Sequence, residues 1–144
     1  MTPRRLDVDV ARNKLAAIED TCDVLTSLGD IDGDRLRDDP VVAAAVERLI
    51  GRLVDLAVDV NSHLAVALLG RAPSEYRESF DLMAQAGVIE LAMAVRLKPS
   101  VGMRNVIVHE YVQLDLARVA AVVPEAIDAY RAYVTAVARF LVDR

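Results

Sequence analysis

Residues 39–70, DPVVAAAVERLIGRLVDLAVDVNSHLAVALLG, predict one long helix. Asp39 is a favoured helix cap, and Pro40 suits the first helical position because the N–H that proline lacks would have no partner there. No proline falls between Val41 and Leu69, and Gly70 is a typical helix end. A helix of about 30 residues spans about 45 Å. We therefore expect this segment to be the spine around which the rest of the chain packs.

Shorter helices are expected on both sides of this spine. Apolar residues at helical spacing predict a helix over residues 7–28, and the acidic stretch 29–34 predicts a loop. Further helices are predicted over residues 74–86, with Ser74 as cap, and over residues 88–97. Pro99 predicts a break or bend at Lys98–Pro99, because proline kinks a helix interior. A helix from residue 99 or 100 to His109 or just beyond, and a last one over residues 114–142 with Pro124 as a candidate interruption, complete the set.

The composition favours an all-α protein. Hydrophobic residues make up 54% of the 144 residues but aromatic residues only 4%, so the apolar mass is mainly Ala, Val and Leu, which suits closely packed helices. Six glycines and five prolines are few for a turn-rich β protein. We predict an up-and-down bundle of four to five helices, forming a single domain over residues 1–144.

Charge and cysteine content argue against a membrane-spanning or secreted protein and against general nucleic-acid binding. The most apolar stretch, 41–69, carries too many charged residues for a lipid-spanning helix, and the first residues lack the apolar core of a signal peptide. The single cysteine, Cys22, is expected in the core of a cytoplasmic protein. The net charge of −5 argues against indiscriminate nucleic-acid binding. An action on RNA would therefore depend on a local cationic site.

The stretch that carries chemistry is 102–111, GMRNVIVHEY. We expect Met103, Val106 and Ile107 to form the apolar stripe of a helix, as their spacing indicates. Asn105 and His109 are four residues apart and share a face. Arg104 and His109 are five apart, about 140° around an ideal helix, so they converge only if the helix distorts or a second chain brings its own copy alongside. This geometry predicts a homodimer with a composite cleft.

Such a cleft suits metal-independent cleavage of RNA. His109 can take a proton from a 2′-hydroxyl or give one to the departing 5′-oxygen, because its pKa lies near neutrality. Arg104 can hold the phosphate and stabilise its developing charge, while Asn105 can orient the imidazole or contact the backbone. The structural alternatives are a histidine that caps a helix end and an arginine in a surface ion pair. Each is the commoner case for such a residue taken alone.

Asp55, Asp59 and His63 lie on one face of the long helix at four-residue spacing. A metal site would need further ligands, so the sequence predicts no metal centre here. A polar seam is the simpler interpretation. Asp59 is placed to hold His63 in one tautomer, and these two residues are second-tier candidates for the cleft.

The pattern Arg-x4-His-x-Tyr, with Asn after the Arg, resembles the signature of HEPN ribonucleases, and the chain resembles the HepT toxins within that superfamily. The resemblance extends over about residues 39–119. It includes the start of the long helix, its polar face with Asp55, Asp59 and His63, and the segments 73–80 and 86–88 before the motif. Pro99 departs from the family, which has an ordinary helix former there.

The resemblance implies a helical HEPN homodimer that acts as the toxin of a type VII HepT/MntA toxin–antitoxin system in the cytoplasm. Arg104 and His109 would cleave RNA, with tRNA as the expected target. Tyr111 would be the regulatory residue, onto which a minimal nucleotidyltransferase antitoxin, MntA, transfers AMP from ATP. The toxin itself would need no cofactor. The alternatives are a non-catalytic HEPN module that binds nucleotide or docks a nucleotidyltransferase, and a plain helical interaction protein in which the motif is coincidental.

Overall fold

A computed structural model describes residues 6–108 and 115–144 of the chain. Within these ranges it contains six helices and no strand, which confirms the all-α prediction. The helices are α1 (Val8–Ser27), α2 (Gly33–Asp38), α3 (Pro40–Leu69), α4 (Tyr76–Gln85), α5 (Leu91–Val108) and α6 (Leu116–Val142).

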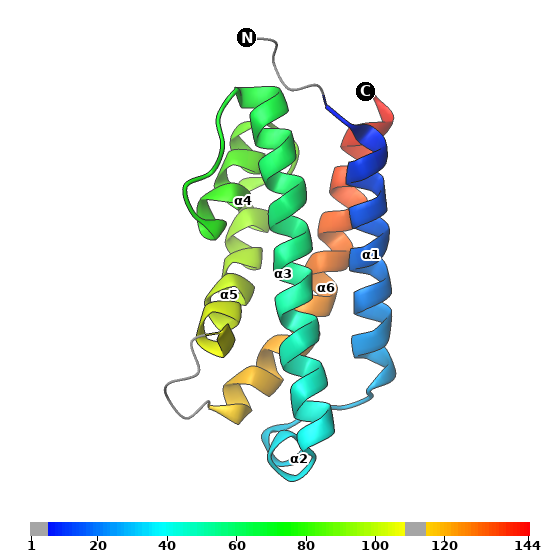
Figure 1. Cartoon of the computed structure of the whole chain (residues 1–144), viewed down its shortest axis with the longest axis vertical. Coiled ribbons are helices and arrows are strands. Elements are labelled where there is room, and N and C mark those ends of the chain that lie inside the picture. The colour runs from blue at the N-terminus through cyan, green and yellow to red at the C-terminus, as the bar shows by residue number, and fades with distance from the viewer. Residues whose placement is uncertain (1–5, 109–114) are drawn as a thin grey trace.

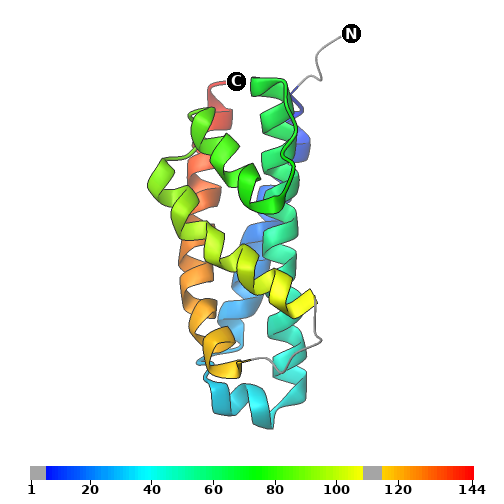
Figure 2. The same ribbon diagram turned by 90° about the vertical axis from the view of Figure 1, so that its left-hand side faces the viewer.

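The long helix α3 is the spine of the bundle, as predicted. It packs against each of the other five helices, lying beside α1 and α6 on one side and α4 and α5 on the other (Figures 1 and 2). Its start is fixed by Asp39, whose Oδ1 accepts hydrogen bonds from the N–H groups of Val41 and Val42 at 3.1 and 3.2 Å. It ends at Gly70, which adopts the left-handed φ of 69° that glycine tolerates. The residue types at both ends therefore account for its length.

Two short elements differ from the prediction. Residues 33–38 form α2, where the sequence predicted only a loop up to residue 34, and the described residues form six helices, against the four to five predicted for the bundle. Asp32 caps α2 by accepting a hydrogen bond from the N–H of Arg35 at 2.8 Å. Helix α4 begins at Tyr76, two residues after the predicted cap. Ser74 instead binds Glu78 through both its N–H and its hydroxyl, at 3.1 and 3.0 Å, and so fixes the entry to α4.

Of the break or bend predicted at Lys98–Pro99, the break does not occur. Helix α5 continues through Pro99, just as α6 continues through Pro124. The carbonyl that Pro99 leaves without a helical partner belongs to Val95, and both residues lie on the exposed side of α5, where water can satisfy it. A proline on the solvent side of a helix therefore costs less than the local rule assumes. One helix, rather than two, carries the motif.

The core contains a chain of hydrogen bonds that reaches the start of α4. Tyr133 on α6 donates to Asn61 Oδ1 at 2.5 Å, and Asn61 Nδ2 donates to Ser79 Oγ at 3.1 Å. The Ser79 hydroxyl in turn donates to the backbone oxygen of Tyr76 at 2.7 Å. Asn61, Ser79 and Tyr133 are all buried, so each polar group depends on these partners. The chain fixes α4 against α3 and α6.

We expect Asn61→Leu to lower the free energy of unfolding by about 1–3 kcal/mol, because the buried hydroxyls of Ser79 and Tyr133 each lose one partner and keep only the backbone oxygens of Tyr76 and Ala57. Urea denaturation followed by circular dichroism measures this change. The neighbouring Ser62 is only partly buried, so Ser62→Leu should stay within about 0.5 kcal/mol of wild type. Equal midpoints for Asn61→Leu and wild type would show that the hydrogen-bond chain does not hold α4.

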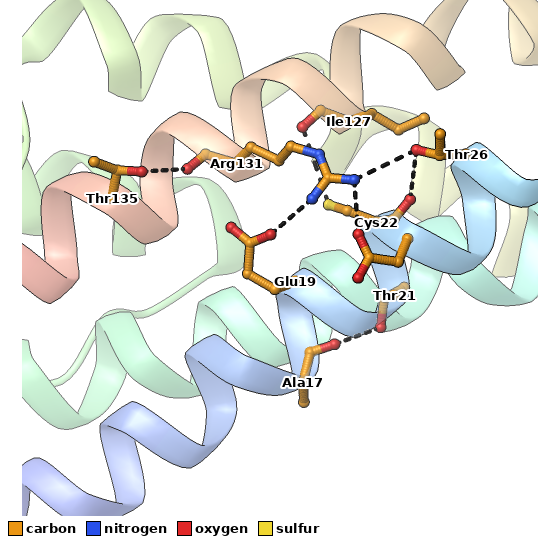
Figure 3. A network of polar contacts seen from close by, with 9 residues as sticks. Ala17, Glu19, Thr21, Cys22, Thr26, Ile127, Arg131 and Thr135 are labelled. Carbon is orange, nitrogen blue, oxygen red and sulfur yellow. Dashed lines mark hydrogen bonds and ion pairs between the residues drawn. The ribbon is translucent and has the colours of Figure 1, made fainter.

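Helices α1 and α6 are joined by a polar network around Arg131 (Figure 3). Its guanidinium binds Glu19 Oε2 at 2.7 Å and Asp23 Oδ1 at 2.9 Å, both on α1. Cys22 lies between these carboxylates in sequence and belongs to the core, as predicted, although it is fully rather than partly buried, and burial raises the pKa of its thiol to about 11. The network positions the two helices and leaves Cys22 as a packing residue.

A search of the helices that the structure describes finds none long and apolar enough to cross a membrane.

Candidate active site

Arg104 lies in the last turns of α5, where α3, α4 and α5 meet. Its side chain is only 21% exposed, and its Nη2 lies 3.4 Å from Asp55 Oδ1 on α3. The guanidinium carbon stands 4.7 Å from the centre of the Tyr76 ring at the start of α4, a favourable cation–π distance. Three helices thus hold one cation in place.

The contacts of Arg104 leave much of its hydrogen-bonding capacity unused. Its Nε and the Oδ1 of Asp55 are both buried and have no hydrogen-bond partner among the described residues. Nη2 faces Asp55, and Nη1 makes only a long contact of 3.4 Å with Asn105 Oδ1. Buried polar atoms without partners are rare in native proteins and call for an explanation. The side chain as a whole is still 21% exposed, so the charge of this fixed guanidinium is available to attract an anionic substrate.

The ring of Tyr76 lies against the Arg104 guanidinium and helps to hold it in place. Burial raises the pKa of its hydroxyl, and the negative charge of Asp55 adds to the rise, while Arg104 opposes it. The phenol therefore stays neutral near physiological pH and offers the face of its ring to the cation. The buried hydrogen bond from Ser79 to the Tyr76 backbone ties this residue to the core.

The other motif residues lie at and beyond the end of α5. Asn105 is exposed and adjoins the Arg104 guanidinium. Of the three residues predicted to form an apolar stripe, Met103 is buried and Ile107 packs against the core, but Val106 is 53% exposed, so that prediction is wrong for Val106. His109 and Tyr111 lie outside the described residues. They follow Val108, the last residue of α5, whose end lies beside the middle of α3 in both views (Figures 1 and 2).

The second-tier residues have partners in the first residues of the described chain. Asp59 Oδ2 lies 3.2 Å from Lys14 Nζ on α1, and the Nε2 of His63 accepts a hydrogen bond of 2.8 Å from the backbone N–H of Asp7. The structure therefore joins Asp55, but not Asp59 or His63, to Arg104, and no hydrogen bond links Asp59 to His63. Their place in the cleft stays a prediction. Within the described ranges, no group of three or more His, Cys, Asp or Glu side chains could hold a metal ion.

Two residues of the site were not assigned to it from the sequence. Asp55 appears there as part of a polar face, and the four-residue spacing does not tell which member of that face meets Arg104. Tyr76 gives no signal at all, because its ring reaches Arg104 only through the crossing of α4 and α5.

The chain was compared with known proteins. A family model described as "Ribonuclease HepT-like" matches residues 16–137. The "mRNA nuclease HepT" of Shewanella oneidensis is 27% identical over 126 residues, which cover 88% of this chain and 94% of that protein. The "tRNA nuclease HepT" of Aphanizomenon flos-aquae is 28% identical over 96 residues, or 67% of this chain and 65% of that protein.

Solved structures agree with these matches. The tri-AMPylated Shewanella oneidensis HEPN toxin in complex with an MNT antitoxin has a TM-score of 0.82 and 26% identity, and the match covers 91% of this chain and 98% of that one. The cytosolic protein YutE of Bacillus subtilis has a TM-score of 0.80 but only 15% identity, with 94% of this chain and 91% of that one covered, so it supports the fold alone.

Proposed function

This chain belongs to the HepT-like ribonuclease family, and we propose that Arg104, His109 and Asn105 carry out its RNA cleavage without a metal ion. It is an RNA endonuclease of the HEPN type and the toxin of a toxin–antitoxin pair. The observation that supports these residue roles best is the partly buried guanidinium of Arg104. It is held by Asp55 and Tyr76 with donors free, five residues before His109 in the chain.

The proposed reaction uses the RNA as its own nucleophile. The 2′-oxygen of a ribose attacks the adjacent phosphorus, the bond from phosphorus to the 5′-oxygen breaks, and the products are a 2′,3′-cyclic phosphate and a 5′-hydroxyl. His109 removes the proton of the 2′-hydroxyl or supplies one to the departing 5′-oxygen. Arg104 binds the non-bridging oxygens and stabilises the charge that develops on them. Asn105 adjoins this guanidinium and helps to orient the phosphate.

We propose that two copies of the chain form the working unit. Helix α5 exposes four large apolar residues that no described helix covers, namely Leu91, Val95, Val106 and Val108, exposed by 66, 59, 53 and 55%. Leu91, Val95 and Val106 lie within about 60° of one another around the helix axis, and this exposed apolar face of the helix that carries the motif is a suitable contact for a second copy. A dimer through this face would bring two motifs together. On one ideal helix, Arg104 and His109 point about 140° apart and do not meet at one phosphate. The His109 of the second copy would complete the pair.

The proposed regulator is an MNT-type nucleotidyltransferase antitoxin. The related Shewanella oneidensis toxin is described as tri-AMPylated and in complex with such an antitoxin. For this chain we propose Tyr111 as an AMP acceptor, with ATP consumed by the partner only. The modification would place negative phosphate close in sequence to His109 and so repel RNA. The proposed substrate, cellular RNA, puts the activity in the cytoplasm.

The class of RNA remains a prediction. One related nuclease is named for mRNA and the other for tRNA. We keep tRNA as the proposed target, and sequencing of the fragments made in cells distinguishes the two classes.

Induced expression of the wild-type chain in bacteria should arrest growth and fragment RNA, and His109→Ala should do neither. Loss of a general acid or base lowers a rate by about 10²–10⁴. Growth curves, and total RNA from the same cultures, measure the effect. The level of soluble protein must be equal in both strains. Arrest by both proteins would contradict the role of His109, while normal growth with both would favour a non-catalytic HEPN module.

A further inference from the structure

Arg77 on α4 reaches across to α5 at a point where α5 has no side chain. Its Nη2 lies 2.9 Å from the position that a Cβ on Gly102 would occupy. Gly102 is inside α5 and has no positive φ, so its backbone does not require glycine. What the missing side chain provides is space, and the Arg77 guanidinium occupies it.

Among the described residues, this guanidinium has no anionic partner. No ion pair or hydrogen bond to Arg77 is found in the part of the chain that the structure describes, and its side chain is exposed. Neighbouring cations differ: Arg71 lies 3.5 Å from Glu78, and Lys98 lies 2.6 Å from Asp81. Within the described ranges, a protein with a net charge of −5 thus leaves the Arg77 guanidinium unpaired against its motif helix.

The position of Arg77 relates it to Arg104. Asn105 lies three residues after Gly102, so the two share a face of α5 and are about 4.5 Å apart along its axis. Asn105 Oδ1 is also 3.4 Å from Nη1 of Arg104. The Arg104 guanidinium therefore contacts Asn105, and the Arg77 guanidinium lies about one turn before Asn105 on the same face of α5. This is a local cationic site on an acidic protein.

We propose that Arg77 binds an RNA backbone phosphate next to the one that is cleaved, and that Gly102 keeps the surface of α5 open for it. The inference rests on the proposed ribonuclease function and assigns Arg77 a positioning role. A planar guanidinium without a carboxylate partner can bind two phosphate oxygens at once. Arg104 acts on the scissile phosphate, while Arg77 fixes the neighbouring one and so sets where the strand lies along α5.

Arg77→Ala should lower kcat/KM for RNA cleavage by roughly five- to twentyfold, mostly through KM, because one charge-assisted contact to the substrate is lost. The plot of log kcat/KM against log salt concentration should become shallower by about 0.7, the value for one phosphate contact to a single strand. A merely structural role would not change this slope. Arg71→Ala removes the same charge from a paired arginine and should leave both quantities unchanged.

Gly102→Ala tests the position of Arg77 without removing its charge. The added Cβ would lie too close to Nη2, so the flexible guanidinium must move, while alanine favours the helix over glycine by about 1 kcal/mol. We expect a fall in kcat/KM of roughly threefold or more with no loss of stability. In the Arg77→Ala background the same change should have no effect. The control is Gly51→Ala on α3, where a Cβ would meet nothing within 4 Å.

The outcomes separate this inference from the function on which it rests. If the wild type cleaves RNA and Arg104→Ala does not, but Arg77→Ala keeps the wild-type KM and salt dependence, Arg77 does not bind substrate. Additive effects of Arg77→Ala and Gly102→Ala would also overturn the link between the two residues. If the wild type itself cleaves no RNA, the proposed function fails first. Unfolding midpoints for all variants exclude misfolding as the cause.

Discussion

Replacing Arg104 with alanine should lower the rate of RNA cleavage by about 10²–10³ while the protein stays folded. The guanidinium is the only cation that the described structure fixes between α3, α4 and α5, and the exposed part of its side chain presents the charge that binds the phosphate. Its removal leaves Asp55 without its partner, but the Asp55 side chain is 45% exposed and truncation of the arginine opens its buried Oδ1 to water, so the cost in stability is small. Initial rates on a labelled RNA measure the loss, and thermal unfolding checks the fold.

Lys98→Ala is the matched control for Arg104→Ala. It removes a positive charge from the same helix, but one already paired with Asp81 at 2.6 Å, and should cleave like wild type. Arg104→Lys keeps the charge but not the planar fork, so we expect an intermediate rate. Equal rates for wild type and a folded Arg104→Ala protein would remove Arg104 from the site.

Tyr111→Phe should abolish neutralisation by the nucleotidyltransferase antitoxin if this tyrosine is the essential acceptor. AMP transfer joins the tyrosine oxygen to the α-phosphorus of ATP and releases pyrophosphate, and phenylalanine has no oxygen to form that bond. Co-expression of the antitoxin should therefore rescue growth with the wild-type toxin but not with Tyr111→Phe. Intact-protein mass spectrometry should show AMP on the wild type, with the label at residue 111 located by peptide mapping.

His109→Ala provides the control for this experiment, because it retains Tyr111. It should carry AMP after incubation with the antitoxin and ATP, even though it needs no neutralisation. Rescue of Tyr111→Phe by the antitoxin would contradict the prediction. It would mean that binding alone silences the toxin, or that AMP is transferred to another residue.

Local sequence rules predicted the helices whose bounds depend only on residues nearby in the sequence. The caps at Asp39 and Gly70 gave the bounds of α3, and the low aromatic content suited close helix packing. The proline rule could not decide between a break and a continuous helix at Pro99, because the cost of a proline depends on whether the freed carbonyl faces solvent. That information comes only with the packing of α5. The short helix α2 was missed because six residues carry too little periodicity to be recognised.

The candidate site likewise contains residues that the sequence could reveal and residues that only the packing of the helices brings together. Arg104 could be found because its spacing to His109 lies within one segment of sequence. Tyr76 and Arg77 could not, since they belong to α4 and reach α5 only through the crossing of the two helices. The glycine at 102 was visible in the motif, but its role depends on a guanidinium that comes from 25 residues earlier in the chain.

Metal-independent RNA cleavage at the Arg104 and His109 pair is the central claim, and the ends of the RNA products test it most directly. The purified wild-type chain should be incubated with RNA in excess EDTA, alongside His109→Ala. The account predicts fragments with 2′,3′-cyclic phosphate and 5′-hydroxyl ends from the wild type and intact RNA from the variant. Fragments with 3′-hydroxyl ends, or cleavage that appears only when a divalent metal is restored, would contradict it.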